Sequence, residues 1–158
     1  MAINVNKSSC LRIGPRCNVI CRNIVTHDEH LISWVDEVKY LGIHINNAQV
    51  FKCTFSDSKK AFYRSVNAIF SQVGRVASEE ITLQLVSTKC IPMLLYGVEA
   101  CPVNRSVLDS FDFTVNRFLM KLFQTSNINV IVDCITYFNF KLPSALVNGN
   151  QETEQFVV

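Results

Sequence analysis

The sequence predicts an α+β fold in which short strands come first and helices follow. Before residue 46, apolar side chains come in short runs that nearly alternate with polar ones and are separated by polar turns. After residue 56, they recur at helical spacing. A chain of 158 residues that is 49% hydrophobic has room for one ordinary domain with a core. We expect small antiparallel strands in residues 1–53, a helical bundle in 54–143 and a disordered tail in 144–158.

The expected strands lie at residues 10–13, 18–25 and 31–35, with short polar joints between them. This arrangement favours an antiparallel meander over βαβ units. The stretch 38–45 follows, with β-branched and aromatic residues around one glycine. We predict a single core strand there, in which Gly42 marks a bulge or a close backbone approach.

The first expected helix runs over residues 57–76, because apolar residues recur there at the spacing of one helix face. These residues are Phe62, Val66, Ile69, Phe70 and Val73. By the same count, Lys60, Arg64 and Arg75 lie on the opposite face, without an acidic residue between them. The helix is therefore predicted to be apolar inward and basic outward, although a cationic face that only contacts water is common.

Three further helices are expected. Ser78 is a plausible N-cap for a helix over residues 81–95, in which Pro92 costs about 3 kcal/mol in regular geometry and predicts a kink or a break. Asn104 is the expected cap of the next helix, and a short helix is expected at 129–138, where the run of Val and Ile would also suit a strand. The polar residues after Pro143 have no periodicity, which indicates the disordered tail.

Composition narrows the functional classes only partly. The net charge of +2 neither requires nor excludes a nucleic-acid partner. No run approaches the ~18 apolar residues of a membrane helix, and no signal peptide is recognisable. Seven cysteines, an odd number, make a disulfide framework unlikely on this reasoning. We expect an intracellular chain, cytoplasmic or nuclear, with reduced thiols and no membrane partner.

One group of residues has the types that bind zinc. Its members are Cys10, Cys17, Cys21, His27 and His30. The Cys-x3-Cys and His-x2-His spacings fall at the edges of those in known zinc sites. Small buried cysteines in strands explain the same residues more simply, so zinc stays an alternative and no metal site is predicted.

Several segments together resemble one family. The core of 38–45, Tyr40-Leu41-Gly42, resembles the primer grip (motif E) of reverse transcriptases, and residues 3–9 resemble their motif D. Residues 61–102 look like the thumb of LINE-type (non-LTR) retrotransposon polymerases, and the resemblance extends to about Pro143. It implies a palm end followed by a helical thumb. The chain then looks like a C-terminal piece of an RNA-directed DNA polymerase.

The resemblance implies a polymerase piece without catalysis. Such enzymes hold two metal ions with aspartates, one set lying in a Tyr/Phe-x-Asp-Asp turn upstream of motif D. This chain has no Asp-Asp pair, so we expect neither polymerase activity nor a bound metal cofactor, although the parent family uses Mg²⁺. Lys7 matches the motif D lysine, which is proposed to protonate the leaving pyrophosphate.

The expected residual role is weak binding of an RNA or DNA primer–template. By resemblance, Tyr40, Leu41 and Gly42 would position the primer end, and by our helix count Lys60, Arg64 and Arg75 would contact phosphates. The expected strands of residues 1–53 would leave unpaired edges, and such edges can pair with another copy of the chain, so we also expect self-association. The alternatives are a helical interaction module whose basic face is merely solvated, and a translated retroelement relic with no function.

Overall fold

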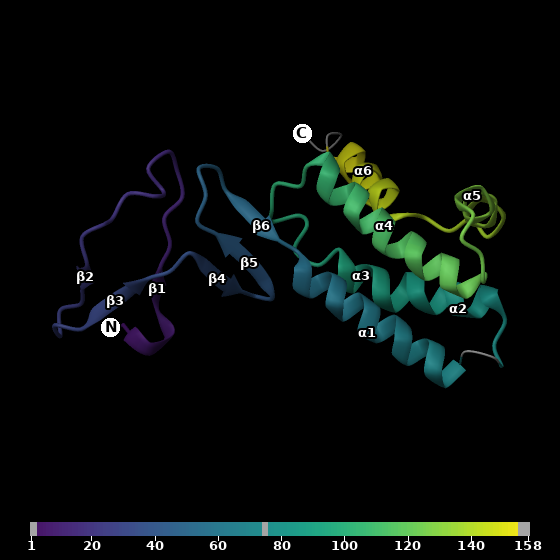
Figure 1. Cartoon of the computed structure of the whole chain (residues 1–158), viewed down its shortest axis with the longest axis horizontal. Helices are drawn as coiled ribbons and strands as arrows, with labels where there is room; N and C mark the ends of the chain where they lie inside the picture. The colour runs from purple at the N-terminus through teal and green to yellow at the C-terminus, as the bar shows by residue number, and fades with distance from the viewer. Residues whose placement is uncertain (1–2, 74–75, 155–158) are drawn as a thin grey trace. The chain divides into compact units, whose positions relative to one another are not determined.

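A computed structural model describes residues 3–73 and 76–154, and it confirms the mixed α+β class. The chain forms two compact units (Figure 1). The first, here called the strand unit, comprises Met1–Asp57 and Glu99–Pro102. The second, the helical unit, comprises Ser58–Val98 and Val103–Val158. The sequence-based boundary at 53/54 lies near the first crossing between them, but residues 99–102 were expected to be part of the helical region.

The first sheet of the strand unit is small and mixed. A 3₁₀ turn, η1 (Val5–Lys7), precedes β1 (Ser9–Cys10), and β3 (Leu31–Trp34) lies between β1 and β2 (Ile24–Val25). β2 pairs with β3 in the antiparallel sense, whereas β1 runs parallel to β3. The predicted all-antiparallel arrangement is therefore wrong here. Ser9 lies opposite Ser33, a pairing between segments distant in the sequence that local patterns do not encode.

The second sheet is an antiparallel meander of β4 (Glu37–Tyr40), β5 (Ile43–Asn46) and β6 (Lys52–Thr54). The prediction of a single strand over 38–45 is wrong, because the chain reverses at Leu41 and Gly42. Both have positive φ, 48° and 84°, which is the two-residue turn that suits the twist of a hairpin. Gly42 therefore makes a turn and not a bulge, and Tyr40 faces Ile43 across it.

The long helix α1 (Ser56–Val73) forms where it was predicted. Phe62 and Val66 are buried at 0% and 3% exposure, as the apolar stripe required. Phe62 packs edge-on against Phe118 of α4 (Arg105–Leu122), with ring centroids 6.5 Å apart. Other large side chains buried almost completely in the helical unit are Leu94, Phe111, Val115, Leu119 and Ile131.

The region around Pro92 is distorted, as its sequence predicts. α2 (Glu79–Leu85) starts at Ser78, whose side chain accepts a hydrogen bond from the Ile81 N–H. It continues into a π-helical segment, η2 (Val86–Cys90), and then α3 (Ile91–Leu94). The N–H of Ile91 donates to the carbonyl of Val86, five residues earlier. This wider turn directly precedes the proline, whose ring would clash with the carbonyl four residues before it in a regular helix.

The last helices complete the helical unit. Asn104 caps α4 by accepting from the Val107 N–H at 3.0 Å, and α5 (Ile128–Tyr137) follows. α6 (Pro143–Glu154) lies alongside α4 (Figure 1), so the expectation of a disordered tail from residue 144 is wrong up to residue 154. The Ser144 N–H donates to Asp112 of α4 at 2.9 Å, a tertiary contact that the polar composition did not reveal. Residues 155–158 lie outside the described part of the chain.

Cys53 of β6 is disulfide-bonded to Cys101, with the two Cα atoms 6.2 Å apart. The expectation of reduced, isolated cysteines is therefore wrong for this pair. Both residues belong to the strand unit, and the bond ties the short segment 99–102 to the second sheet. In residues 3–73 and 76–154, no helix is both long and apolar enough to cross a membrane.

Candidate nucleic-acid interface

The hairpin between β4 and β5 presents the residues that resemble a primer grip. Tyr40 and Leu41 are 63% and 66% exposed, and Gly42 is exposed beside them. Ile43, the next residue, is buried at 8% exposure and anchors the start of β5. The structure thus brings the three predicted residues together on one turn. Tyr40 and Leu41 therefore leave apolar side-chain surface exposed at the tip of the hairpin.

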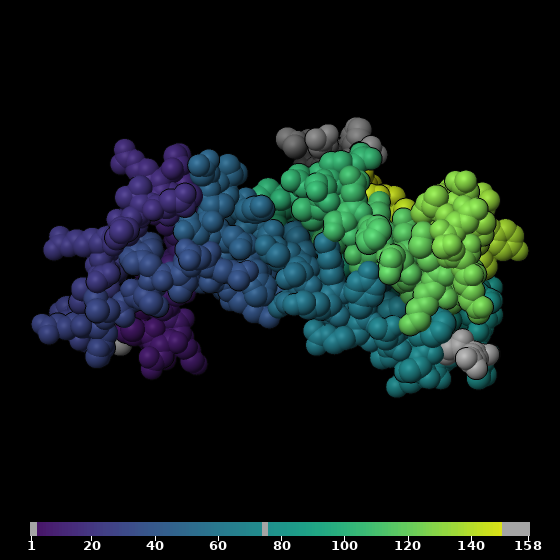
Figure 2. Space-filling model, viewed as in Figure 1, coloured from purple at the N-terminus to yellow at the C-terminus, as the bar shows by residue number. Residues whose placement is uncertain are grey.

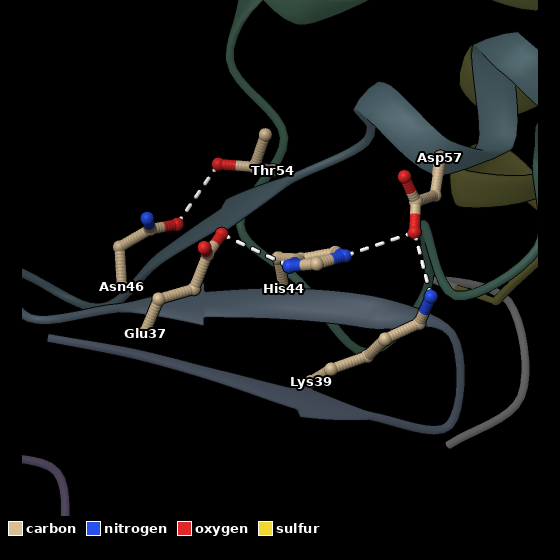
Figure 3. Close-up of polar contacts among 6 residues, drawn as sticks. All are labelled: Glu37, Lys39, His44, Asn46, Thr54 and Asp57. Atoms are coloured by element: carbon tan, nitrogen blue, oxygen red, sulfur yellow. Dashed lines mark hydrogen bonds and ion pairs between the residues drawn. The ribbon is translucent and has the colours of Figure 1, made fainter. Parts of the chain in front are cut away.

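One face of this sheet is polar because cross-strand neighbours share a face. Lys39 lies opposite His44, and His44 lies opposite Thr54 of β6. The imidazole of His44 sits between two carboxylates (Figure 3). Its Nδ1 lies 3.0 Å from Glu37 Oε1 and its Nε2 lies 3.0 Å from Asp57 Oδ2. Each ring nitrogen of His44 therefore lies within hydrogen-bonding distance of one carboxylate oxygen.

Asp57 joins the hairpin to the first turn of α1. Its Oδ2 also accepts from Lys39 Nζ at 2.6 Å (Figure 3). The hydrogen bond from Lys39, and next the one from His44, hold the pKa of the Asp57 carboxyl far below its usual value of 3.8. Asp57 is therefore ionised at neutral pH.

We call this set Glu37, Lys39, His44 and Asp57 the hairpin ion-pair network. Its contacts link β4, β5 and the first turn of α1. Sequence reasoning missed the network. The alternation of charged residues at 37, 39 and 44 was a usable signal, but only with the turn placed at 41–42 does the register bring them to one face.

The predicted basic face of α1 is present as far as the structure describes it. Lys60 and Arg64 are exposed and lie one turn apart, and the Arg64 side chain donates to the Lys60 carbonyl at 3.4 Å. Arg75, the third predicted cation, lies outside the described residues. Tyr63, 38% exposed, lies between the two cations in the sequence. The Tyr63 ring packs edge-on against Phe62, with ring centroids 5.9 Å apart.

Two other lysines of the helical unit are held by internal contacts. Lys59 donates to Ser110 and lies over the Phe111 ring, 5.6 Å from its centroid. Lys121 lies 5.2 Å from the centroid of the Phe70 ring and donates to Asn67. These cation–π contacts use the ammonium groups within the fold.

The remaining predicted site residues lie in the strand unit. Lys7 is exposed at the end of η1. Within residues 3–73 and 76–154, no group of three or more His, Cys, Asp or Glu side chains is arranged so that it could hold a metal ion, so the zinc alternative for Cys10, Cys17, Cys21, His27 and His30 gains no support. Instead, Cys21 accepts from the Arg12 guanidinium, whose Nη1 lies 2.7 Å from the sulfur.

Comparison of the chain with protein-family models, with curated proteins and with solved structures finds no match.

Proposed function

We propose that the chain is a catalytically incomplete fragment of a retrotransposon RNA-directed DNA polymerase that binds the backbone of a primer–template. The observation that carries the proposal is the amphipathic α1, in which Phe62 and Val66 are buried while Lys60 and Arg64 are exposed. The sequence has no Asp-Asp pair, and for this reason the proposal calls the chain catalytically incomplete. This chain alone should not extend a primer.

The binding role follows from the chemistry of the exposed cations. Residues four apart on a helix lie about 5–6 Å apart, so Lys60 and Arg64 can contact neighbouring phosphates of one strand. Such contacts release counterions and carry no sequence information. The proposed ligand is therefore duplex nucleic acid of any sequence, bound weakly.

The hairpin tip has a second part in the proposal. By resemblance to the primer grip, Tyr40, Leu41 and Gly42 support the primer end. Their exposure and the rigid two-residue turn support this role. An apolar tip packs against sugar and base edges, whereas the cations of α1 contact phosphates.

Binding to a labelled primer–template duplex, measured by fluorescence anisotropy as salt is varied, tests the proposal. Two phosphate contacts predict a slope of log affinity against log salt of about −2, and a contact from Arg75 would take it towards −3. Reversing Lys60→Glu and Arg64→Glu together should abolish binding. The matched control is Arg105→Glu with Lys141→Glu, which changes the net charge equally at exposed positions elsewhere on the helical unit.

Equal binding by the parent and by the Lys60/Arg64 variant would refute the proposal, as would an affinity independent of salt. Loss of binding in both charge-reversal variants would show that total charge, and not the α1 face, attracts the nucleic acid. Circular dichroism on each variant confirms that the helices remain.

A helical interaction module is the second candidate, and α5 favours it. Ile128, Val130, Val132 and Tyr137 are 47%, 41%, 53% and 83% exposed, while Ile131 of the same helix is buried. Figure 2 shows the residues of this helix, in yellow-green, at the surface of the helical unit. Exposed apolar side chains gathered on one helix are typical of protein–protein contact. If Val132→Asp changes the oligomeric state in light scattering while the Lys60/Arg64 reversal has no effect on nucleic-acid binding, this candidate is preferred.

A further inference from the structure

The second sheet of the strand unit has two edge strands, β4 and β6, which differ in their surroundings. β6 is linked by the disulfide of Cys53 with Cys101 to the segment 99–102. On the outer side of β4, no strand of residues 3–73 and 76–154 is paired. The side chain of Lys39 is 57% exposed, and Tyr40 is 63% exposed. An open edge of this kind is a template on which another strand can pair.

The turn that ends β4 determines which of its backbone groups face outward. Tyr40 flanks the two-residue turn, so it exchanges hydrogen bonds with the residue across it, and every second residue back along β4 does the same with β5. The bond from the Asn47 N–H to the Asp36 carbonyl, 2.7 Å long, fits this alternation. Glu37 and Lys39 therefore direct their backbone N–H and C=O groups away from β5, toward the open edge.

The side chains of these two residues have opposite charges and lie on one face of the sheet (Figure 3). An antiparallel second copy of β4 can pair so that Val38 faces Val38 across a two-fold axis. Glu37 then faces Lys39 on both sides of the axis, and each pair exchanges two backbone hydrogen bonds. The other two-fold registers that use the same backbone groups place Lys39 against Lys39 or Glu37 against Glu37, which is unfavourable. Charge thus selects one register.

Charged side chains often protect an edge strand from pairing, because they meet no counter-charge on the incoming strand. Here Glu37 and Lys39 provide that counter-charge for each other. The Lys39 ammonium has three N–H donors, so it can donate to Asp57 and also to a carboxylate of the second copy. On the other face of the sheet, the exposed Tyr40 lies diagonal to Val38 of the second copy, within reach of a large side chain.

We propose that β4 is a homodimer interface, through which two copies of the chain pair in the antiparallel sense with Val38 at the two-fold axis. The two second sheets then form one sheet of six strands, in the order β6-β5-β4-β4-β5-β6. The two hairpin ion-pair networks join through Glu37 and Lys39. The sequence led us to expect self-association without naming an edge, and the inference does not depend on nucleic-acid binding.

The parent chain itself provides the first test. Analytical ultracentrifugation over a range of concentrations should show a monomer–dimer equilibrium. Where about nine-tenths of the chain is dimeric, hydrogen exchange followed by NMR should be about tenfold slower at the Glu37 and Lys39 amides than in the monomer. The Val38 and Tyr40 amides, already bonded to β5, should change less. The proposal is overturned if the chain stays monomeric, or if the Glu37 and Lys39 amides exchange equally fast in monomer and dimer.

Val38→Cys tests the register. In the proposed dimer the two new thiols meet at the axis, with Cα atoms about 4.5 Å apart, which allows a disulfide. Tyr40→Cys is the matched control, because its two copies lie about 14 Å apart along the paired strands. After mild oxidation, peptide mass spectrometry should find the 38–38 cross-link in at least about fivefold excess over the 40–40 cross-link. Equal yields of the two would overturn the register.

An exchange of charges separates pairing from folding. Glu37→Lys alone and Lys39→Glu alone each place like charges opposite one another twice, so each should raise the dissociation constant of the dimer about tenfold or more. An equimolar mixture of the two variants restores opposite charges and should form mixed dimers. The contacts within each copy are as altered in the mixture as in the separate variants, so only pairing between copies explains a rescue.

Folded variants that fail to pair when mixed would overturn the proposal. The same holds if Val132→Asp in α5 abolishes the dimer while both charge variants leave it intact, because α5 then carries the association. Circular dichroism identifies a variant that has unfolded, and the exchange rates of Glu37 and Lys39 in the parent chain then decide.

Discussion

The two units of the chain differ in what holds them together. In the helical unit, apolar side chains such as Phe62, Phe111 and Leu119 are at most 1% exposed. In the described part of the strand unit, the buried apolar residues are few and mostly cysteines: Cys17, Ile43, Cys53, Phe55 and Cys101. Side chains of β2 and β3 that a larger sheet would cover, such as Val25 and Leu31, are more than half exposed.

The comparison shows two ways of stabilising a compact unit, one in the helical unit and the other in the strand unit. The helical unit gains free energy from apolar burial, at about 25 cal/mol per Å². The strand unit has too little buried surface for that, and it uses a disulfide, a tight hairpin turn and the hairpin ion-pair network. The two units should therefore respond differently to mutation, reduction and acid.

The largest expected effect is in the helical unit. Phe111→Ala removes a fully buried ring from α4 and should lower the free energy of unfolding by about 3–5 kcal/mol. Phe113→Ala is the matched control, because Phe113 is on the same helix and 63% exposed. Denaturant melts followed by circular dichroism measure both. Similar losses for the two variants would contradict the core that the structure assigns.

The next effect is in the strand unit. Replacing both Cys53 and Cys101 by serine should destabilise that unit by about 2–4 kcal/mol, because the bond closes a long loop of 48 residues. Hydrogen exchange should speed up at β4, β5 and β6. Cys134→Ser, in α5, serves as the control and should leave those amides unchanged. Unchanged protection in the double variant would show that the second sheet does not depend on the bond.

A gain in stability is expected at the hairpin tip. Leu41 has φ of 48°, a conformation that costs an ordinary side chain about 1–2 kcal/mol. Leu41→Asn creates the Asn-Gly pair that two-residue turns prefer, so the strand unit should become about 1 kcal/mol more stable. Gly42→Ala, at φ of 84°, should have the opposite effect. If Leu41→Asn also weakens nucleic-acid binding, the apolar tip serves contact at the expense of stability.

The smallest expected effect concerns acid. The folded-state pKa of Asp57 is depressed, chiefly by Lys39 and then by His44. Its ionisation therefore stabilises the fold above the unfolded-state value of 3.8, and this contribution is lost as the pH falls below that value. Between about pH 6 and about pH 2, Asp57→Asn should show a smaller drop in the midpoint of thermal unfolding than the parent. Asp133→Asn in α5 is the control, and equal drops in the parent and Asp57→Asn would contradict the assignment.

Sequence reasoning succeeded where one periodicity governs one element. α1 was predicted from Phe62 and Val66, and the distortion near Pro92 from the chemistry of proline. It failed where the outcome depends on contacts between distant segments. The pairing of Cys53 with Cys101 has no local signal, and α6 is tied to α4 by the contact of Ser144 with Asp112.

The candidate site was predicted only in part. Tyr40, Leu41 and Gly42 were singled out by resemblance, and the cations of α1 by helical spacing. The contacts of His44 with Glu37 and Asp57 were not foreseen, because 38–45 was interpreted as one strand. A shift from strand to hairpin reverses which side chains share a face, so an error at one turn hides a whole polar cluster.

The disulfide between Cys53 and Cys101 also determines how the chain transmits force. If the molecule is pulled from its two ends, tension passes from one cysteine to the other through the sulfur atoms, and the loop between them, which spans a sequence separation of 48, is not stretched. That loop contains α1, α2 and α3, which stay out of the load path until the bond is reduced. Reduction would then release about 160–170 Å of additional extension, at 3.3–3.6 Å per residue. In a single-molecule experiment the chain thus has a short, oxidised length and a long, reduced one.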